Sequence, residues 1–260
     1  MAVVHHHLPL SARLPARGIF EDDWRDRPSK RHPYPVILIH GTGVTKGDWM
    51  ELGHTLRSLG YAVWAPDFGM RSTAAVAESA AQVGAYIDAV LTVTKAKKAI
   101  VVGHSQGGIL ARYWMHNLDG ANKVSHLISL AVPHHGTSHG GMMSPLGRTP
   151  RGTAVIDSLI TGFFGASGFE MLHDSELIAQ LNADGDTLPY VYYSCIATRS
   201  DTIIQPVESC FLHGKLVRNI YAQAVSKHAI ILHEDMPHDP RVRRLVIAEI
   251  ERVESLTIPS

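Results

Sequence analysis

A serine between two glycines is the first group in the chain that could do chemistry. Residues 101–108 read VVGHSQGG, so Gly103, Ser105 and Gly107 fit the pattern G-x-S-x-G. In a sharp strand-to-helix turn, small neighbours keep strand and helix clear of the serine and its hydroxyl stays accessible. A valine-rich run precedes Ser105 and a helical pattern follows it, as a nucleophile requires. Ser105 is the candidate nucleophile; the alternatives are a phosphate-binding turn or close packing alone.

A serine nucleophile also needs donors that stabilise the oxyanion of the tetrahedral intermediate. The sequence HGTG at residues 40–43 follows the first strong strand pattern, so its amides can point into the same cleft as the serine. We therefore expect the main-chain amides of Thr42 and Gln106 to form an oxyanion hole. The alternative interpretation of HGTG is an ordinary glycine turn.

A serine nucleophile and its histidine base need a carboxylate that orients the histidine. Where the serine follows a strand of a parallel sheet, this Asp or Glu is expected between the serine and the histidine along the chain. Asp201 lies in a loop directly after a predicted strand, whereas Asp184 and Asp186 precede that strand, at its wrong end. Asp201 is the preferred carboxylate, although an isolated aspartate in a turn often only caps it.

The base is less well defined, because four histidines follow Asp201: His213, His228, His233 and His238. His228 lies near the end of a predicted strand and is expected to be structural. His233 and His238 both lie in the loop before the last predicted helix, where a base belongs. Spacing alone does not separate these two.

The chain alternates strand and helix patterns from residue 34 onward. Strands are predicted at 34–40, 61–66, 99–103, 124–131, 190–197 and 219–225, and helices at 49–59, 73–94, 106–117 and 240–254. This alternation predicts an α/β fold with a mostly parallel sheet, helices on both faces, and functional groups at the carboxyl ends of the strands. We divide the chain into an N-terminal extension (1–33) and one domain (34–260).

Composition narrows the classes of partner. The 260 residues are 45% hydrophobic, enough for a sizeable core. Because 24 basic residues balance 24 acidic ones, no nucleic-acid partner is expected. No run approaches the roughly 20 apolar residues of a membrane-spanning helix, so no stable membrane insertion is expected. A bridge between Cys195 and Cys210 and the oligomeric state both stay open.

Residues 138–186 are predicted to be a lid or cap insertion within the domain. The segment is rich in large apolar side chains, from which we select Met142, Met143, Phe163 and Phe164 as candidate substrate-binding residues. Flexible methionines suit a surface that adapts to different acyl chains. The equal alternative is a pair of helices that simply packs on the core.

Six stretches, in this order, resemble the actinobacterial lipases of the α/β-hydrolase fold, with a match from about residue 23 onward. They read HPYPVILIHGTG, GYAVWAPDFG, VVGHSQGGILARYW, AVPHHGTSHGG, LNADGDTLPYVYYSCIATRSDTIIQPVES and HEDMPHDPRV. In that family the catalytic histidine precedes an Asp-Pro pair by six positions, which here implies His233. The resemblance likewise implies Ser105 as nucleophile, Asp201 as carboxylate, and Thr42 and Gln106 as oxyanion donors.

The expected function is that of a serine hydrolase: cleavage of carboxylic esters, lipid-like acyl esters in particular, through a Ser-His-Asp triad and an acyl-enzyme. No cofactor and no metal are expected. The alternatives are an acyltransferase or thioesterase with the same triad, or a non-catalytic binding protein of the same fold. A metal site at His134, His135 and His139 is disfavoured, because the neighbouring glycines argue against a helix there.

The first residues, MAVVHHHLPLSARLPAR, lack the charged and apolar regions of a secretory signal. A cytoplasmic location is therefore favoured, although the lipases that the chain resembles are commonly secreted.

Overall fold

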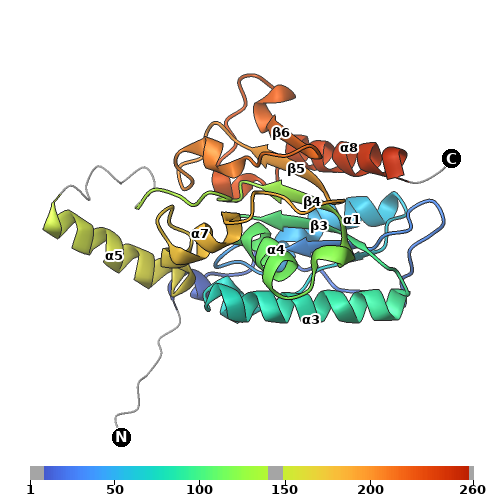
Figure 1. The fold of residues 1–260 in the computed structure, drawn as a ribbon, viewed down its shortest axis with the longest axis horizontal. Helices are drawn as coiled ribbons and strands as arrows, with labels where there is room; N and C mark the ends of the chain where they lie inside the picture. Colours follow the sequence, from blue (N-terminus) through green and yellow to red (C-terminus); the bar gives the residue numbers. More distant parts are fainter. Residues whose placement is uncertain (1–8, 140–148, 258–260) are drawn as a thin grey trace, which may run out of the picture.

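Six parallel strands form one sheet at the centre of the molecule (Figure 1). The computed structural model describes residues 9–139 and 149–257. The strands are β1 (Val36–Ile39), β2 (Val63–Trp64), β3 (Ala99–His104), β4 (Val124–Leu130), β5 (Tyr192–Ala197) and β6 (Val217–Tyr221). Their order across the sheet is β2-β1-β3-β4-β5-β6, and every neighbouring pair is parallel. The predicted strands and the parallel sheet are thus present, with shorter bounds at several ends, while the last strand begins two residues earlier than predicted and ends at Tyr221.

Helices cover both faces of this sheet (Figure 1). They are α1 (Met50–Ser58), α2 (Gly69–Ser72), α3 (Val76–Thr94), α4 (Gln106–Asn117), α5 (Pro150–Phe164), α6 (Ser167–Glu170), α7 (Glu176–Asn182) and α8 (Pro240–Thr257). Ile37 and Ile39 of β1 belong to the core formed with α3 and α4, whereas Val36 and Leu38 belong to the core formed with α1 and α8. This alternation is the two-residue period of a strand buried on both faces.

The carboxyl ends of the parallel strands gather the polar loops at one edge of the sheet. HGTG follows β1, Ser105 follows β3, and the loop that holds Asp201 follows β5. Because β1, β3, β4 and β5 are consecutive neighbours in the sheet, residues far apart in the sequence meet there.

The described part of the predicted insertion is helical. Thr149 caps α5 by accepting a hydrogen bond from the Gly152 amide, and Pro150 occupies the first turn, where its missing N–H costs nothing. α5 extends from the body of the molecule (Figure 1), while Ile178 and Leu181 of α7 are buried in the main core. Whether this insertion acts as a lid stays a prediction. Met142 and Met143 lie outside the described residues.

The described residues of the N-terminal segment pack on the domain. The Phe20 ring is buried in the core on the α1 side, and a carboxylate oxygen of Asp22 accepts a hydrogen bond from the Ala65 amide at 2.9 Å. Cys195 and Cys210 are both free, buried thiols, so no bridge joins them. Within residues 9–139 and 149–257, no helix combines the length and hydropathy needed to cross a bilayer.

A buried series of hydrogen-bonded side chains links β4, β5 and α8. The His126 imidazole lies 2.9 Å from the Ser194 hydroxyl, which donates to Glu249 at 2.8 Å. Burial lowers the pKa of His126 to about 3. Its pKa in an unfolded chain is about 6.5.

Folding stability should consequently fall as the pH drops below 6.5. Between the two pKa values the unfolded chain binds a proton at this residue and the folded chain does not, so acid favours unfolding. From pH 8 to pH 5 His126 should cost about 2 kcal/mol of the free energy of unfolding. Urea unfolding at both pH values should show a drop about 2 kcal/mol smaller in His126→Gln than in the wild type. The exposed His228, replaced in the same way, should leave the drop unchanged; equal drops in all three proteins would contradict the prediction.

Candidate active site

Ser105 occupies the turn between β3 and α4 with a strained backbone. Its φ of 51° and ψ of −127° lie in a region that non-glycine residues rarely adopt. The two glycines make this turn possible, because a Cβ on Gly103 would lie 2.6 Å from the Gly108 nitrogen and one on Gly107 would lie 2.3 Å from the Ile39 oxygen. The pattern G-x-S-x-G therefore follows from steric crowding around the serine.

The serine hydroxyl is hydrogen-bonded to His233. Its Oγ lies 2.9 Å from Nε2 of the imidazole, and Nδ1 of the same ring lies 2.8 Å from Oδ2 of Asp201. Since an ionised carboxylate only accepts, Nδ1 carries the proton and Nε2 accepts from Ser105. All three residues are buried. This geometry matches a nucleophile, its base and the group that orients the base.

Asp201 is held by its own loop. Its Oδ1 accepts hydrogen bonds from the Ile203 and Ile204 amides, both at 2.8 Å. The Gln205 side chain also donates to its main-chain oxygen at 2.6 Å. Oδ2 is thereby left to face His233.

His104, between Gly103 and Ser105, contacts the main chain of His233. Its Nε2–H donates to the main-chain oxygen of His233 at 3.0 Å. Burial lowers the pKa of His104 well below its ordinary value, so the ring is neutral, and the carbonyl acceptor places its single proton on Nε2. The sequence analysis gave this histidine no role, because its partner is 129 residues away.

The two residues expected to supply the oxyanion donors are linked through their side chains. Gln106 is the first residue of α4, where a helix leaves its amides without intrahelical acceptors. The Thr42 hydroxyl donates to the side-chain oxygen of Gln106, which ties the HGTG turn to the start of α4. His40 braces the same turn: its Nδ1–H donates to the Gly41 oxygen at 2.8 Å and its ring stacks on Phe68. Burial lowers the pKa of His40, which favours the neutral ring.

Comparison with known proteins agrees with this architecture. The model of the alpha/beta hydrolase family matches residues 36–256. The chain belongs to the alpha/beta hydrolase family. Its six-stranded parallel sheet and helical layers are accordingly those of an α/β-hydrolase fold.

Two curated triacylglycerol lipases are similar to part of this α/β-hydrolase. The one from Pseudarthrobacter phenanthrenivorans is 28% identical over 142 residues, which cover 52% of this chain and 44% of that protein. The one from Burkholderia plantarii is 28% identical over the same length and is covered to 39%. The matched part spans less than half the length of both relatives.

Solved structures share the fold at low sequence identity. Aspergillus fumigatus lipase B superposes with a TM-score of 0.65 at 20% identity, covering 84% of this chain and 52% of that chain. A thermostable carboxylesterase cloned from a metagenomic library gives a TM-score of 0.61 at 14% identity, covering 87% of this chain and 81% of that chain.

The structure places the histidines and aspartates among which the sequence left a choice in different surroundings. His233 contacts Ser105, whereas the ring of His238 lies 3.7 Å from Asp48. The side chains of His213 and Asp186 pair with each other, away from His233. His228 and Asp184 are exposed.

An apolar cavity of about 460 Å³ opens onto Ser105. Phe163 and Phe164, both selected from the sequence, line it. Its other apolar walls include Ile156, Leu159, Ile160, Met171, Leu172, Ile203 and Ile204. The sequence analysis missed Ile203 and Ile204; their signal was the apolar pair that begins two residues after Asp201.

Proposed function

We propose that this α/β-hydrolase cleaves carboxylic esters with an apolar acyl chain, through Ser105, His233 and Asp201 as a catalytic triad. The observation that carries the proposal is the hydrogen-bonded series from Ser105 through His233 to Asp201 at the mouth of an apolar cavity. The similarity to triacylglycerol lipases over part of the chain supports the same reaction class.

The first half of the reaction acylates the serine. Oγ of Ser105 attacks the ester carbonyl carbon while Nε2 of His233 takes the hydroxyl proton, and Asp201 stabilises the resulting imidazolium. The amides of Thr42 and Gln106 hold the oxyanion, each contributing about 3 kcal/mol to the barrier reduction. The intermediate then expels the alcohol, which receives its proton from His233.

The second half releases the acyl group. His233 removes a proton from water, the resulting hydroxide attacks the acyl carbon, and the bond to Oγ breaks as the proton returns to Ser105. No metal and no cofactor take part in these steps. The cavity would hold the acyl chain, because its walls are mainly apolar side chains.

Hydrolysis of p-nitrophenyl esters from acetate to palmitate tests the proposal. We expect kcat/KM to rise from acetate to chains of intermediate length, since each buried methylene adds about 0.8 kcal/mol of binding. A fluorophosphonate probe should label the peptide that contains Ser105. A folded protein that neither cleaves any of these esters nor reacts with the probe would overturn the proposed function.

A charge in the cavity wall should reduce chain-length preference. Leu159 lines the cavity from α5 and is 49% exposed, so Leu159→Asp should fold. We expect its kcat/KM for octanoate to fall about 10-fold while acetate changes little, because only the longer chain loses apolar contact. Val155→Asp, one turn earlier on α5 and outside the cavity wall, is the matched control. Equal losses on both esters, or equal effects of both variants, would assign the acyl chain to another surface.

A further inference from the structure

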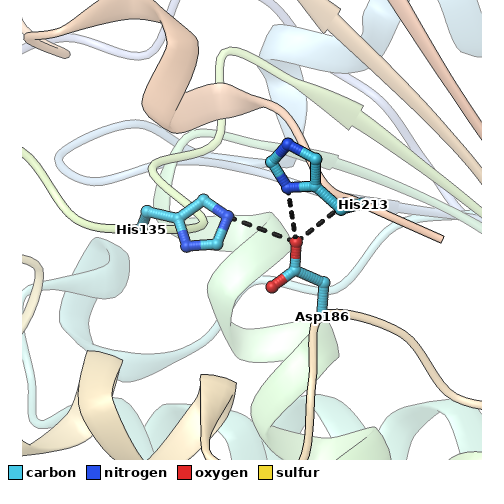
Figure 2. Close-up of side chains that lie close together, drawn as sticks. All are labelled: His135, Asp186 and His213. Atoms are coloured by element: carbon cyan, nitrogen blue, oxygen red, sulfur yellow. Dashed lines mark hydrogen bonds and ion pairs between the residues drawn. The ribbon is translucent and has the colours of Figure 1, made fainter.

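A second cluster of polar side chains has no member in the proposed triad. His135 comes from the loop after β4, Asp186 from the loop between α7 and β5, and His213 from the segment before β6. Figure 2 shows the imidazole rings of His135 and His213 both facing one carboxylate oxygen of Asp186. The cluster shares no residue with Ser105, Asp201 or His233.

The donor atoms have the spacing of metal ligands. Oδ2 of Asp186 lies 3.4 Å from Nε2 of His135 and 3.1 Å from Nδ1 of His213, and all three atoms lie within 4.8 Å of one another. A tetrahedral zinc ion with bonds of about 2.0–2.1 Å places its ligand atoms about 3.3 Å apart. The two distances from Oδ2 of Asp186 to the imidazole nitrogens are already close to this value. The distance between the two imidazole nitrogens can adjust through rotation of the His213 side chain, which is 85% exposed.

Hydrogen bonds within this cluster leave one imidazole nitrogen, Nε2 of His135, without a hydrogen-bond partner among the described residues. Oδ2 of Asp186 already accepts from the His213 amide at 2.7 Å and lies against the His213 ring. Nε2 of His135 is buried and makes no hydrogen bond within the described residues. One cation between the rings would bond to both imidazole nitrogens and to the carboxylate, which a single shared proton does not achieve.

The backbone around the ligands is fixed independently of any ion. The His135 amide donates to the Ser209 oxygen at 3.1 Å. The buried guanidinium of Arg112 donates to the main-chain oxygens of His134 and Asp186 at 3.4 and 3.0 Å. Two of the ligands are thus presented by loops that the core holds in place.

We propose that His135, Asp186 and His213 bind one divalent transition-metal ion of the zinc type, with water as the fourth ligand. Two imidazoles and one carboxylate are a common donor set for such ions. The ion would join the loop after β4 to the segments before β5 and β6, and its role would be structural. This site differs from the sequence-based expectation of no metal, and it does not depend on the proposed ester hydrolysis.

The test is titration of the full chain, stripped with a chelator, with Zn²⁺ in a calorimeter and with Co²⁺ by visible absorption. We expect one equivalent to bind, with the intense visible bands of tetrahedral Co²⁺, and to raise the melting temperature. His213→Ala should weaken binding about 100-fold. Because the His213 side chain is mostly exposed, this variant should keep its fold and its metal-free melting temperature.

Two controls separate the proposed site from other histidines. His228→Ala removes an exposed imidazole outside the cluster and should leave the affinity unchanged. Replacing His5, His6 and His7 by alanine should also leave it unchanged. Unaltered binding in His213→Ala, or loss of binding in the variant without the three N-terminal histidines, would overturn the proposal.

Discussion

Ser105→Ala should lower kcat/KM for p-nitrophenyl esters at least about 10⁴-fold, because it removes the atom that forms the acyl-enzyme. The fold should survive, since alanine is smaller than serine and adopts the same strained turn. Far-UV circular dichroism and the melting temperature check the fold, while initial rates over the ester series check the activity. Residual hydrolysis within 10-fold of the wild type would show that another group attacks the ester.

Two further variants form a matched pair that tests which histidine is the base. His233→Ala removes the ring that hydrogen-bonds Ser105, whereas His238→Ala removes a ring that faces Asp48. We expect the first to lose about as much activity as Ser105→Ala, because residues that act as one unit have non-additive effects. The second should stay within about threefold of the wild type. A larger loss in His238→Ala than in His233→Ala would reassign the base.

Arg112→Met should lower the free energy of unfolding by about 3–5 kcal/mol. The guanidinium is fully buried and donates to the Leu181 oxygen at 3.2 Å and the Asn182 side chain at 2.9 Å, in addition to the loops before β5 and after β4. Methionine fills a similar volume but donates nothing, so several buried oxygens lose their partner. Urea unfolding followed by tryptophan fluorescence measures the difference.

Arg112→Lys distinguishes charge from geometry. Lysine keeps the charge but lacks the planar fork that reaches several acceptors at once, so an intermediate loss of stability is expected. Equal stability of the wild type and Arg112→Met would mean that the oxygens find other donors.

The sequence predicted the sheet well because strands buried on both faces are continuous apolar runs. VILI at β1 and the valines of β3 are examples, each ending at a glycine turn. The helical character of residues 150–182 was harder to predict. Glycines and phenylalanines gather in residues 162–169 and obscure its period, and α5 buries only Ile156 and Ile160.

The candidate nucleophile was readable because steric crowding fixes a local pattern, G-x-S-x-G. The spacing of residues did not separate His233 from His238, and only the family resemblance favoured His233, since the two histidines differ in which partner the fold brings near them. Arg112 had no local signal, and the sequence analysis considered His135 as a metal ligand only with His134 and His139, not with Asp186 and His213. Their partners come from separate loops, and only the folded chain places them together.

The parallel sheet has a consequence for how this chain reaches its native state. Parallel neighbours need long crossover connections, so no strand pair in the sheet can form as a hairpin, and folding should take milliseconds to seconds. The Ser105–His233 contact spans 128 residues. Under the proposed mechanism, Ser105 has no base until the segment that contains His233 has been synthesised and folded, so the onset of activity would report the last steps of folding.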